Sequence, residues 1–362
     1  MSTNATAVEP VSWDLARRVA AQALRIAPVL EDGQRRAFKS DIDEAARRAE
    51  GLVEETTGLV STAGPPNAVV VDRLGWVDAN ISSFKRLLNP LATRLADRPR
   101  LVPAVSSPAG AAVSGAEVGL VLAWLSSRVL GQYDLFASEE EGSDAVYFVA
   151  PNIIAIERRH AFPPQEFRLW IAIHELTHRA QFTGVPWMRE YFLGLVERGT
   201  TLAPPDGKTI MAGLLQAVEA VRSGRNPLAD GGIVSLLASA EQLATLHEAQ
   251  ALMSLLEGHS DVVMSSAATA EIPGAKRFAR VLSERRTSTK GVAKLLQQFI
   301  GIDAKLRQYE EGERFVEAVQ KEGGNALLAK VWSGQSFLPS LEEIRNPSAW
   351  IARTAGADSP LG

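Results

Sequence analysis

Apolar residues recur every three or four positions along most of this 362-residue chain, and this spacing constrains the fold more than any other feature. The segment from Trp13 to Ile26 shows the pattern, because Leu15, Val19 and Ala23 fall near one side of a helix and the arginines fall elsewhere. The same periodicity predicts helices at about 35–58, 78–96, 115–131, 166–183, 187–198, 208–222, 232–265, 274–286, 290–320 and 339–352. The sequence therefore predicts a mainly α-helical protein.

Two stretches depart from the helical pattern. Residues 145–156 read AVYFVAPNIIAI, two β-branched and aromatic runs interrupted by Pro151 and Asn152, and they predict a bent strand or a hairpin. Residues 100–115 are rich in proline, serine, glycine and alanine, and they predict a loop. We therefore expect a small β element beside a helical body.

Domain organisation follows from the absence of any long linker or repeat in the sequence. Short breakers such as Gly323-Gly324 separate the predicted helices. We expect one domain over residues 1–362. The alternative is an N-terminal helical subdomain at 10–100 packed on a catalytic portion at 101–352.

Composition excludes several classes of function. The formal charge of -4 provides no field that would attract nucleic acid. Cysteine is absent, so the chain has no disulfide, no thiol nucleophile and no cysteine-ligated metal. We expect a cytoplasmic protein without a membrane partner, because the sequence shows no apolar leader and no run of about 18 apolar residues. Any metal must bind to nitrogen and oxygen ligands.

The chemistry is concentrated in IAIHELTHRAQF at 171–182, where His174, Glu175 and His178 form H-E-x-x-H on a predicted helix. Residues four apart are turned by about 40° and raised by about 6 Å, so both imidazoles project from one face and can bind one Zn²⁺. Glu175 is rotated by about 100° from His174, beside that face, where it can act as general base on a water. The alternative is a chance match, with a probability on the order of one in two hundred.

A catalytic zinc site usually has a third protein ligand, and LLEGHSDVV at 255–263 offers it. Glu257 and Asp261 share a helix face, as in the ligand helix of glutamate zincins. In that arrangement Glu257 binds zinc and Asp261 hydrogen-bonds the outer nitrogen of a ligand histidine. His259 is the rival ligand, and because it lies about 160° around the helix from Glu257, both can bind only if the helix unwinds at Gly258.

For other residues, the sequence gives weaker indications of a role at the site. Tyr191 and Tyr309 could each present a hydroxyl to a developing oxyanion, although a structural role is the simpler interpretation for both. His247 lacks a second histidine four residues on and is interpreted as a surface or core residue. The strand before the motif could pair with an extended peptide if its edge is exposed.

Several strings together resemble a known family: WDLA near the start, VLGQYDLF at 129–136, HELTHRAQF at 174–182, LEGHSDVV at 256–263 and KLRQYEEGERF at 305–315. The chain resembles the actinobacterial zincin-like metallopeptidases, some of which are associated with deazaflavin-coenzyme biosynthesis. The resemblance implies a zincin-like helical fold over about residues 12–350. It also implies His174, His178 and Glu257 at the metal, with Glu175 as the base.

The leading hypothesis is a zinc-dependent hydrolase, a metallopeptidase that cleaves a peptide or small amide with Glu175 as general base. A noncatalytic helical binding protein with a retained metal site is one alternative, and a fourth protein ligand such as His259 would indicate it. A small-molecule amidase is the other. The sequence leaves the oligomeric state open, and Mn, Co or Fe could occupy the same ligands.

Overall fold

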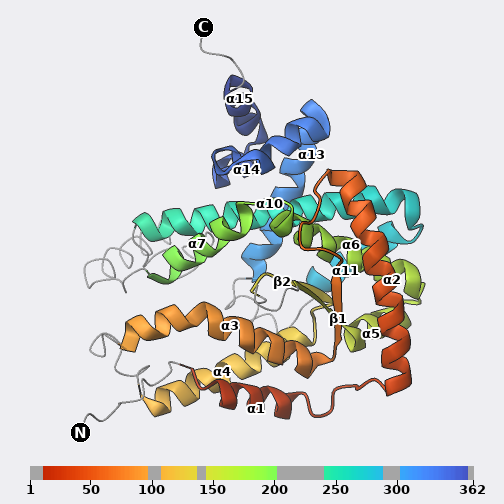
Figure 1. Cartoon of the computed structure of the whole chain (residues 1–362), viewed down its shortest axis with the longest axis vertical. Coiled ribbons are helices and arrows are strands. Elements are labelled where there is room, and N and C mark those ends of the chain that lie inside the picture. Colours follow the sequence, from red (N-terminus) through yellow and green to blue (C-terminus); the bar gives the residue numbers. More distant parts are fainter. Residues whose placement is uncertain (1–10, 97–106, 137–143, 202–239, 288–301, 358–362) are drawn as a thin grey trace, which may run out of the picture. The chain divides into compact units, whose positions relative to one another are not determined.

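The computed structural model describes residues 11–96, 107–136, 144–201, 240–287 and 302–357, and these are mainly helical with a three-stranded sheet (Figure 1). The predicted fold class is confirmed. By its contacts the chain forms two compact units, one of Met1–Leu52 with Ser61–Arg179 and one of Val53–Val60 with Ala180–Gly362. The single-domain organisation stays a prediction.

The sheet of the first unit has the strand order β1-β3-β2. The central strand β3 (Ala145–Val149) pairs in parallel with β1 (Asn67–Val71) and antiparallel with β2 (Gly131–Asp134). Because both sides of β3 are paired, the idea that the strand before the motif offers an edge to a peptide is wrong. The edge strand that runs antiparallel to β3 is β2.

The bent strand or hairpin predicted for 145–156 is half right, because the helix α5 (Ala150–His160) follows β3 directly. Pro151 lies in the first turn of α5, where its missing N–H costs no helical hydrogen bond. The proline that suggested an interrupted strand therefore starts a helix.

The predicted loop at 100–115 is wrong from residue 108 onward, where the helix α4 (Pro108–Ser126) begins. Ser107 caps this helix by accepting a hydrogen bond from the Gly110 N–H at 3.0 Å, and Pro108 occupies the first turn. Residues 100–106 lie outside the described residues.

Helices surround the sheet within the first unit (Figure 1). They are α1 (Trp13–Ala23), most of α2 (Asp32–Thr57), α3 (Arg73–Ala96), α4, α5 and most of α6 (Pro164–Thr183). A buried cluster around Trp13, Trp76 and Leu122 joins α1, α3 and α4. The first unit therefore has its core between these helices and β3, to which Val149 contributes.

By length and composition α4 could cross a membrane, with a mean hydropathy of 1.4, and it is the one described helix that could. Its packing gives another reason for its apolar character. A Cβ added to Gly115 or Gly119 would come within 2.4 Å of the backbone oxygens of Ser12 and Ala16. The small residues of α4 therefore let it lie directly against α1 inside the first unit.

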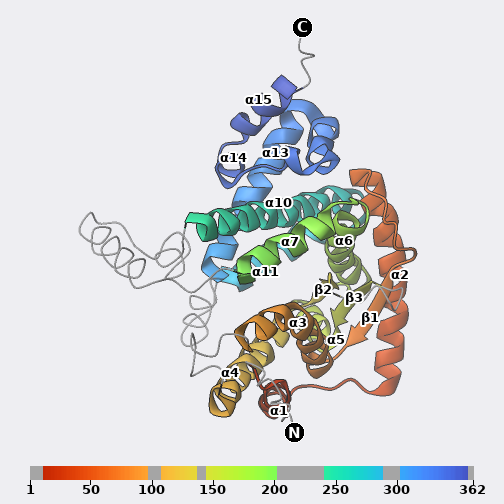
Figure 2. The ribbon, with the colours of Figure 1, turned by 60° about the vertical axis from the view of Figure 1, so that its left-hand side comes forward.

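The second unit is built on two long helices, α10 (Ala240–Glu271) and α13 (Ile302–Ser333), with α7 (Met188–Thr201) beside α10 (Figure 2). The remaining elements are α11 (Ala275–Thr287), η2 (Gln335–Phe337), α14 (Leu341–Arg345) and α15 (Pro347–Ala357). The predicted break at Gly323-Gly324 is confirmed by a kink in α13, where Gly324 has a φ of 64°. The predicted helix at 208–222 lies outside the described residues.

The long helices α10 and α13 cross at a pair of glycines. A Cβ on Gly258 would lie 2.1 Å from the Gly312 carbonyl carbon, and a Cβ on Gly312 would lie 1.8 Å from the Ser254 oxygen. The unwinding at Gly258 that joint binding by Glu257 and His259 would require is not observed, because α10 continues as one helix from Ala240 to Glu271. Gly258 is needed for the close approach of α13.

Replacing Gly312 with alanine should therefore lower the free energy of unfolding by about 3 kcal/mol, because the added methyl group would meet backbone atoms that cannot move aside. Thermal or urea unfolding measures the change. Gly199→Ala is the matched control, since a Cβ there meets nothing within 4 Å. Equal stability of the two variants would contradict the glycine crossing.

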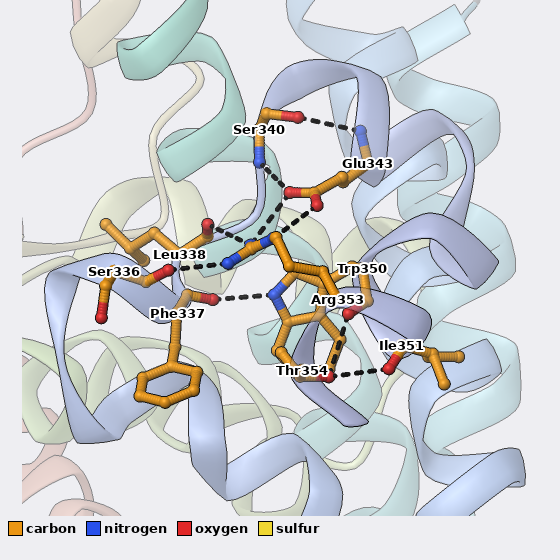
Figure 3. Close-up of polar contacts among 9 residues, drawn as sticks. All are labelled: Ser336, Phe337, Leu338, Ser340, Glu343, Trp350, Ile351, Arg353 and Thr354. Carbon is orange, nitrogen blue, oxygen red and sulfur yellow. Dashed lines mark hydrogen bonds and ion pairs between the residues drawn. The ribbon is translucent and has the colours of Figure 1, made fainter. Parts of the chain in front are cut away.

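The C-terminal helices of the second unit are tied together by Arg353 (Figure 3). Its guanidinium donates to the Glu343 carboxylate at 2.7 and 3.0 Å, to the Ser336 carbonyl at 2.7 Å and to the Leu338 carbonyl at 3.0 Å. Burial alone would raise the pKa of Glu343, but hydrogen bonds from Arg353 and Ser340 outweigh it and hold this pKa below its usual value. These contacts fix η2 and α14 against α15.

Candidate functional site

The two histidines of the motif lie one turn apart on α6. Their ring centroids are 4.7 Å apart, with the rings nearly perpendicular at 86°, and both side chains are partly exposed. The predicted juxtaposition of two imidazoles on one helix face is thus present. A pair of histidine rings so placed can offer two nitrogens to one metal ion.

Glu175 is buried between α6 and the edge strand β2, with 7% of its surface exposed. Its Oε2 accepts a hydrogen bond from the backbone N–H of Tyr133 at 3.1 Å. Its side chain also lies against Gly131, where an added Cβ would come within 2.6 Å of the Glu175 Cγ and Oε1. The carboxylate predicted to act as a base is therefore held by the backbone of β2.

The motif helix is fastened within the first unit by Arg179, the residue after His178, whose side chain is completely buried. Its guanidinium donates to Glu50 on α2 at 2.6 Å, to the carbonyl of Gly64 at 2.6 Å and to Asp144, just before β3. This arginine thus connects α6 to α2 and to the start of the central strand.

The predicted third ligand and its supporting carboxylate lie on α10 in the second unit. Glu257 is 8% exposed and Asp261 is partly exposed. Because α10 is regular here, the two carboxylates lie one turn apart and share a helix face. The spacing on which their predicted roles depend is therefore present.

His259, the rival ligand, is buried inside the second unit with 2% exposure. Its ring packs against Trp332 at a centroid distance of 4.9 Å, and its Nδ1 lies 2.9 Å from the Gln181 side-chain nitrogen. The Gln181 nitrogen also donates to the Leu256 carbonyl at 3.0 Å. Since α10 does not unwind at Gly258, Glu257 and His259 do not share a face.

The structure gives little support for an oxyanion role of the two tyrosines, for which a structural role was the simpler interpretation. Tyr191 lies on α7 and, with His247, lines a cavity of about 840 Å³ in the second unit, whereas Glu257 does not line this cavity. Burial, followed by the nearby Glu248 carboxylate, raises the pKa of Tyr191, so its hydroxyl stays protonated at neutral pH. Tyr309 belongs to α13, but its side chain lies outside the described residues.

Sequence reasoning missed four residues that build this site: Gly131, Tyr133, Arg179 and Gln181. The only signal for Arg179 and Gln181 was their position, because both lie in the same helical segment as the motif. Gly131 and Tyr133 act through backbone contacts, which side-chain chemistry in a sequence does not reveal.

Comparison with known proteins indicates the family of the chain. The zincin-like metallopeptidase family matches residues 11–351. A crystal structure from Chloroflexus aurantiacus, described as a presumed hydrolase with a novel fold, has 29% sequence identity and a TM-score of 0.71, covering 95% of this chain and 99% of that chain. No curated protein is significantly similar to the sequence. Since the family match includes both the motif helix α6 and the carboxylate helix α10, the chain belongs to the zincin-like metallopeptidase family.

Proposed function

We propose that this protein is a zinc-dependent hydrolase that cleaves a peptide or amide bond with Glu175 as general base. The family and the similar structure support a hydrolase. That the metal is zinc and that the bond cleaved is a peptide or amide bond is proposed in addition. One observation carries the proposal. α6 presents two imidazoles with ring centroids 4.7 Å apart, and the residue between them in the motif is a buried carboxylate.

The proposed ligands are His174, His178 and Glu257, a set of two imidazoles and one carboxylate that suits a metal ion. Support comes from a contact inside the second unit. Gln181, three residues after His178 on α6, donates to the Leu256 carbonyl of α10 at 3.0 Å. Glu257 is the next residue along α10. In this proposal Asp261 hydrogen-bonds a ligand histidine and fixes its orientation.

A bound Zn²⁺ would lower the pKa of a water toward about 7 and polarise the scissile carbonyl. The proton transfers are assigned to a residue of the chain. Glu175 takes a proton from the attacking water, and it then donates this proton to the departing amine. Burial of Glu175 against β2 keeps bulk water away from the carboxylate and strengthens its electrostatic interactions.

Peptides and small amides are both candidate substrates. β2 is an edge strand, but its outward Tyr133 N–H donates to Glu175, so this edge does not by itself favour an extended peptide that pairs with the strand. A cytoplasmic location and an association with deazaflavin-coenzyme biosynthesis stay predictions from the sequence and its resemblance.

The proposal is tested by stripping the purified protein of metal, reloading it with Zn²⁺ and assaying a panel of peptides and small amides. We expect hydrolysis that returns with zinc and disappears with a chelator. Cleavage of small amides alone would indicate an amidase. Zinc binding without hydrolysis of any substrate in the panel would instead favour the noncatalytic binding protein.

A further inference from the structure

The strand β2 presents alternate backbone groups to two different neighbours. The Val149 N–H donates to the Leu130 carbonyl at 2.8 Å, just before β2 begins. Hydrogen-bonded pairs alternate along an antiparallel ladder, so Gln132 and Asp134 direct their backbone groups toward β3. Gly131 and Tyr133 therefore direct their backbone groups away from β3. The Tyr133 N–H donates to Glu175 on that side.

Two side chains of β2 fasten the strand to α3. Gln132 and Asn80 exchange amide hydrogen bonds at 3.2 and 3.3 Å. The buried Asp134 carboxylate accepts from the Ser83 hydroxyl at 3.1 and 3.2 Å. The residues of β2 that do not face Glu175 thus hold the strand in place.

The entry to β2 is fixed by Asn152, which is 2% exposed. Its side-chain nitrogen donates to the carbonyls of Ser126 and Val129, both at 2.7 Å, and its oxygen accepts from Arg73 at 2.8 Å. The segment between α4 and β2 is therefore bound to α5. With the contacts to α3, this anchors β2 at its start and along its length.

A side chain at Gly131 would displace Glu175. The φ of Gly131 is not positive, so alanine suits the backbone, but the added Cβ would lie 2.6 Å from Glu175 atoms. Because β2 is anchored, the Glu175 side chain would have to yield. Glycine at this position is therefore explained by the place that Glu175 occupies.

We propose that Gly131 and Tyr133 are positioning residues that set the location of the Glu175 carboxylate, with Gly131 leaving space for it and the Tyr133 N–H holding it. This inference rests on the proposed role of Glu175 as the base. A carboxylate placed before substrate arrives needs no reorganisation when it accepts the proton, and a displacement of about 1 Å can lower turnover about a hundredfold.

The hydrogen bond from the Tyr133 N–H to Glu175 is tested by amide hydrogen exchange, which needs no activity assay, on metal-free protein labelled with ¹⁵N-tyrosine. The chain has 4 tyrosines, so few amide signals need assignment, and Tyr147 of the central strand β3 is an internal reference. We expect Glu175→Ala to speed hydrogen exchange at the Tyr133 amide about tenfold, and Glu175→Gln to retain its protection, because glutamine still offers an acceptor oxygen. Unchanged exchange at Tyr133 in Glu175→Ala would overturn the proposal.

The steric part is tested with Gly131→Ala in the zinc-loaded protein. We expect kcat to fall about a hundredfold, with KM and zinc content unchanged. Gly33→Ala is the matched control in the same unit, since a Cβ there meets nothing within 4 Å. Wild-type turnover in Gly131→Ala would overturn the proposal.

The two hypotheses fail in different ways. A wild-type protein that hydrolyses nothing contradicts the proposed function, while protection of the Tyr133 amide by Glu175 still supports the positioning contact. Hydrolysis that requires Glu175, combined with a Tyr133 amide that exchanges freely, supports the function and contradicts the positioning role.

Discussion

Glu175→Gln should lower kcat by about a thousandfold or more while the protein keeps its metal. Glutamine has nearly the same shape as glutamate and can accept the Tyr133 N–H, but it cannot take a proton from water. The loss should therefore appear in the chemical step, with KM little changed. Steady-state kinetics on the zinc-loaded variant, beside its zinc content, measure both quantities.

Glu166→Gln is the matched control, because it makes the same substitution in the first turn of α6. We expect it to keep wild-type kcat. Full activity in Glu175→Gln would remove the proposed base, whereas a loss of zinc in that variant would show that Glu175 supports the ligands as well.

Arg179→Met should lower the free energy of unfolding by about 3–5 kcal/mol, because it leaves carboxylates without their cation in a buried site. Arg179 has no exposed side-chain surface, and its partner Asp144 is only 11% exposed. The stability of the motif helix therefore depends on this arginine. Denaturant unfolding monitored by circular dichroism measures the change.

Arg17→Met is its control in the same unit. Arg17 pairs with Asp78 at 2.8 Å, but its side chain is 53% exposed, so we expect a change of about 1 kcal/mol or less. Similar losses in the two variants would contradict the interpretation that burial makes the Arg179 contacts important. Arg179→Lys should recover only part of the stability, since a lysine cannot reproduce the several directed bonds of a guanidinium.

The sequence predicted the helical class and the placement of the motif on α6, because both depend on local periodicity. It predicted less well where tertiary contacts decide the local structure. Residues 108–115 resemble a loop in composition, yet a serine cap and close packing on α1 make them helical. The run NAVVV forms β1, which was not predicted, since five residues carry too little periodicity to identify a strand.

The residues of the candidate site also divide into those that local spacing predicts and those that only tertiary contacts explain. His174, Glu175 and His178 were identified because their spacing has a local meaning on a helix. The role of Gly258 was not predicted, because a side chain there would collide with Gly312, which lies on another helix far along the chain. Long-range contacts of this kind leave no pattern in a single sequence.

The most direct test of the account is the zinc content of the purified wild-type protein beside His178→Ala, with His247→Ala as the control at an exposed histidine of α10. The account predicts about one zinc ion per chain in the wild type and in His247→Ala, and almost none in His178→Ala. Undiminished zinc in His178→Ala, or a wild-type protein that binds no metal when zinc is supplied, would contradict it.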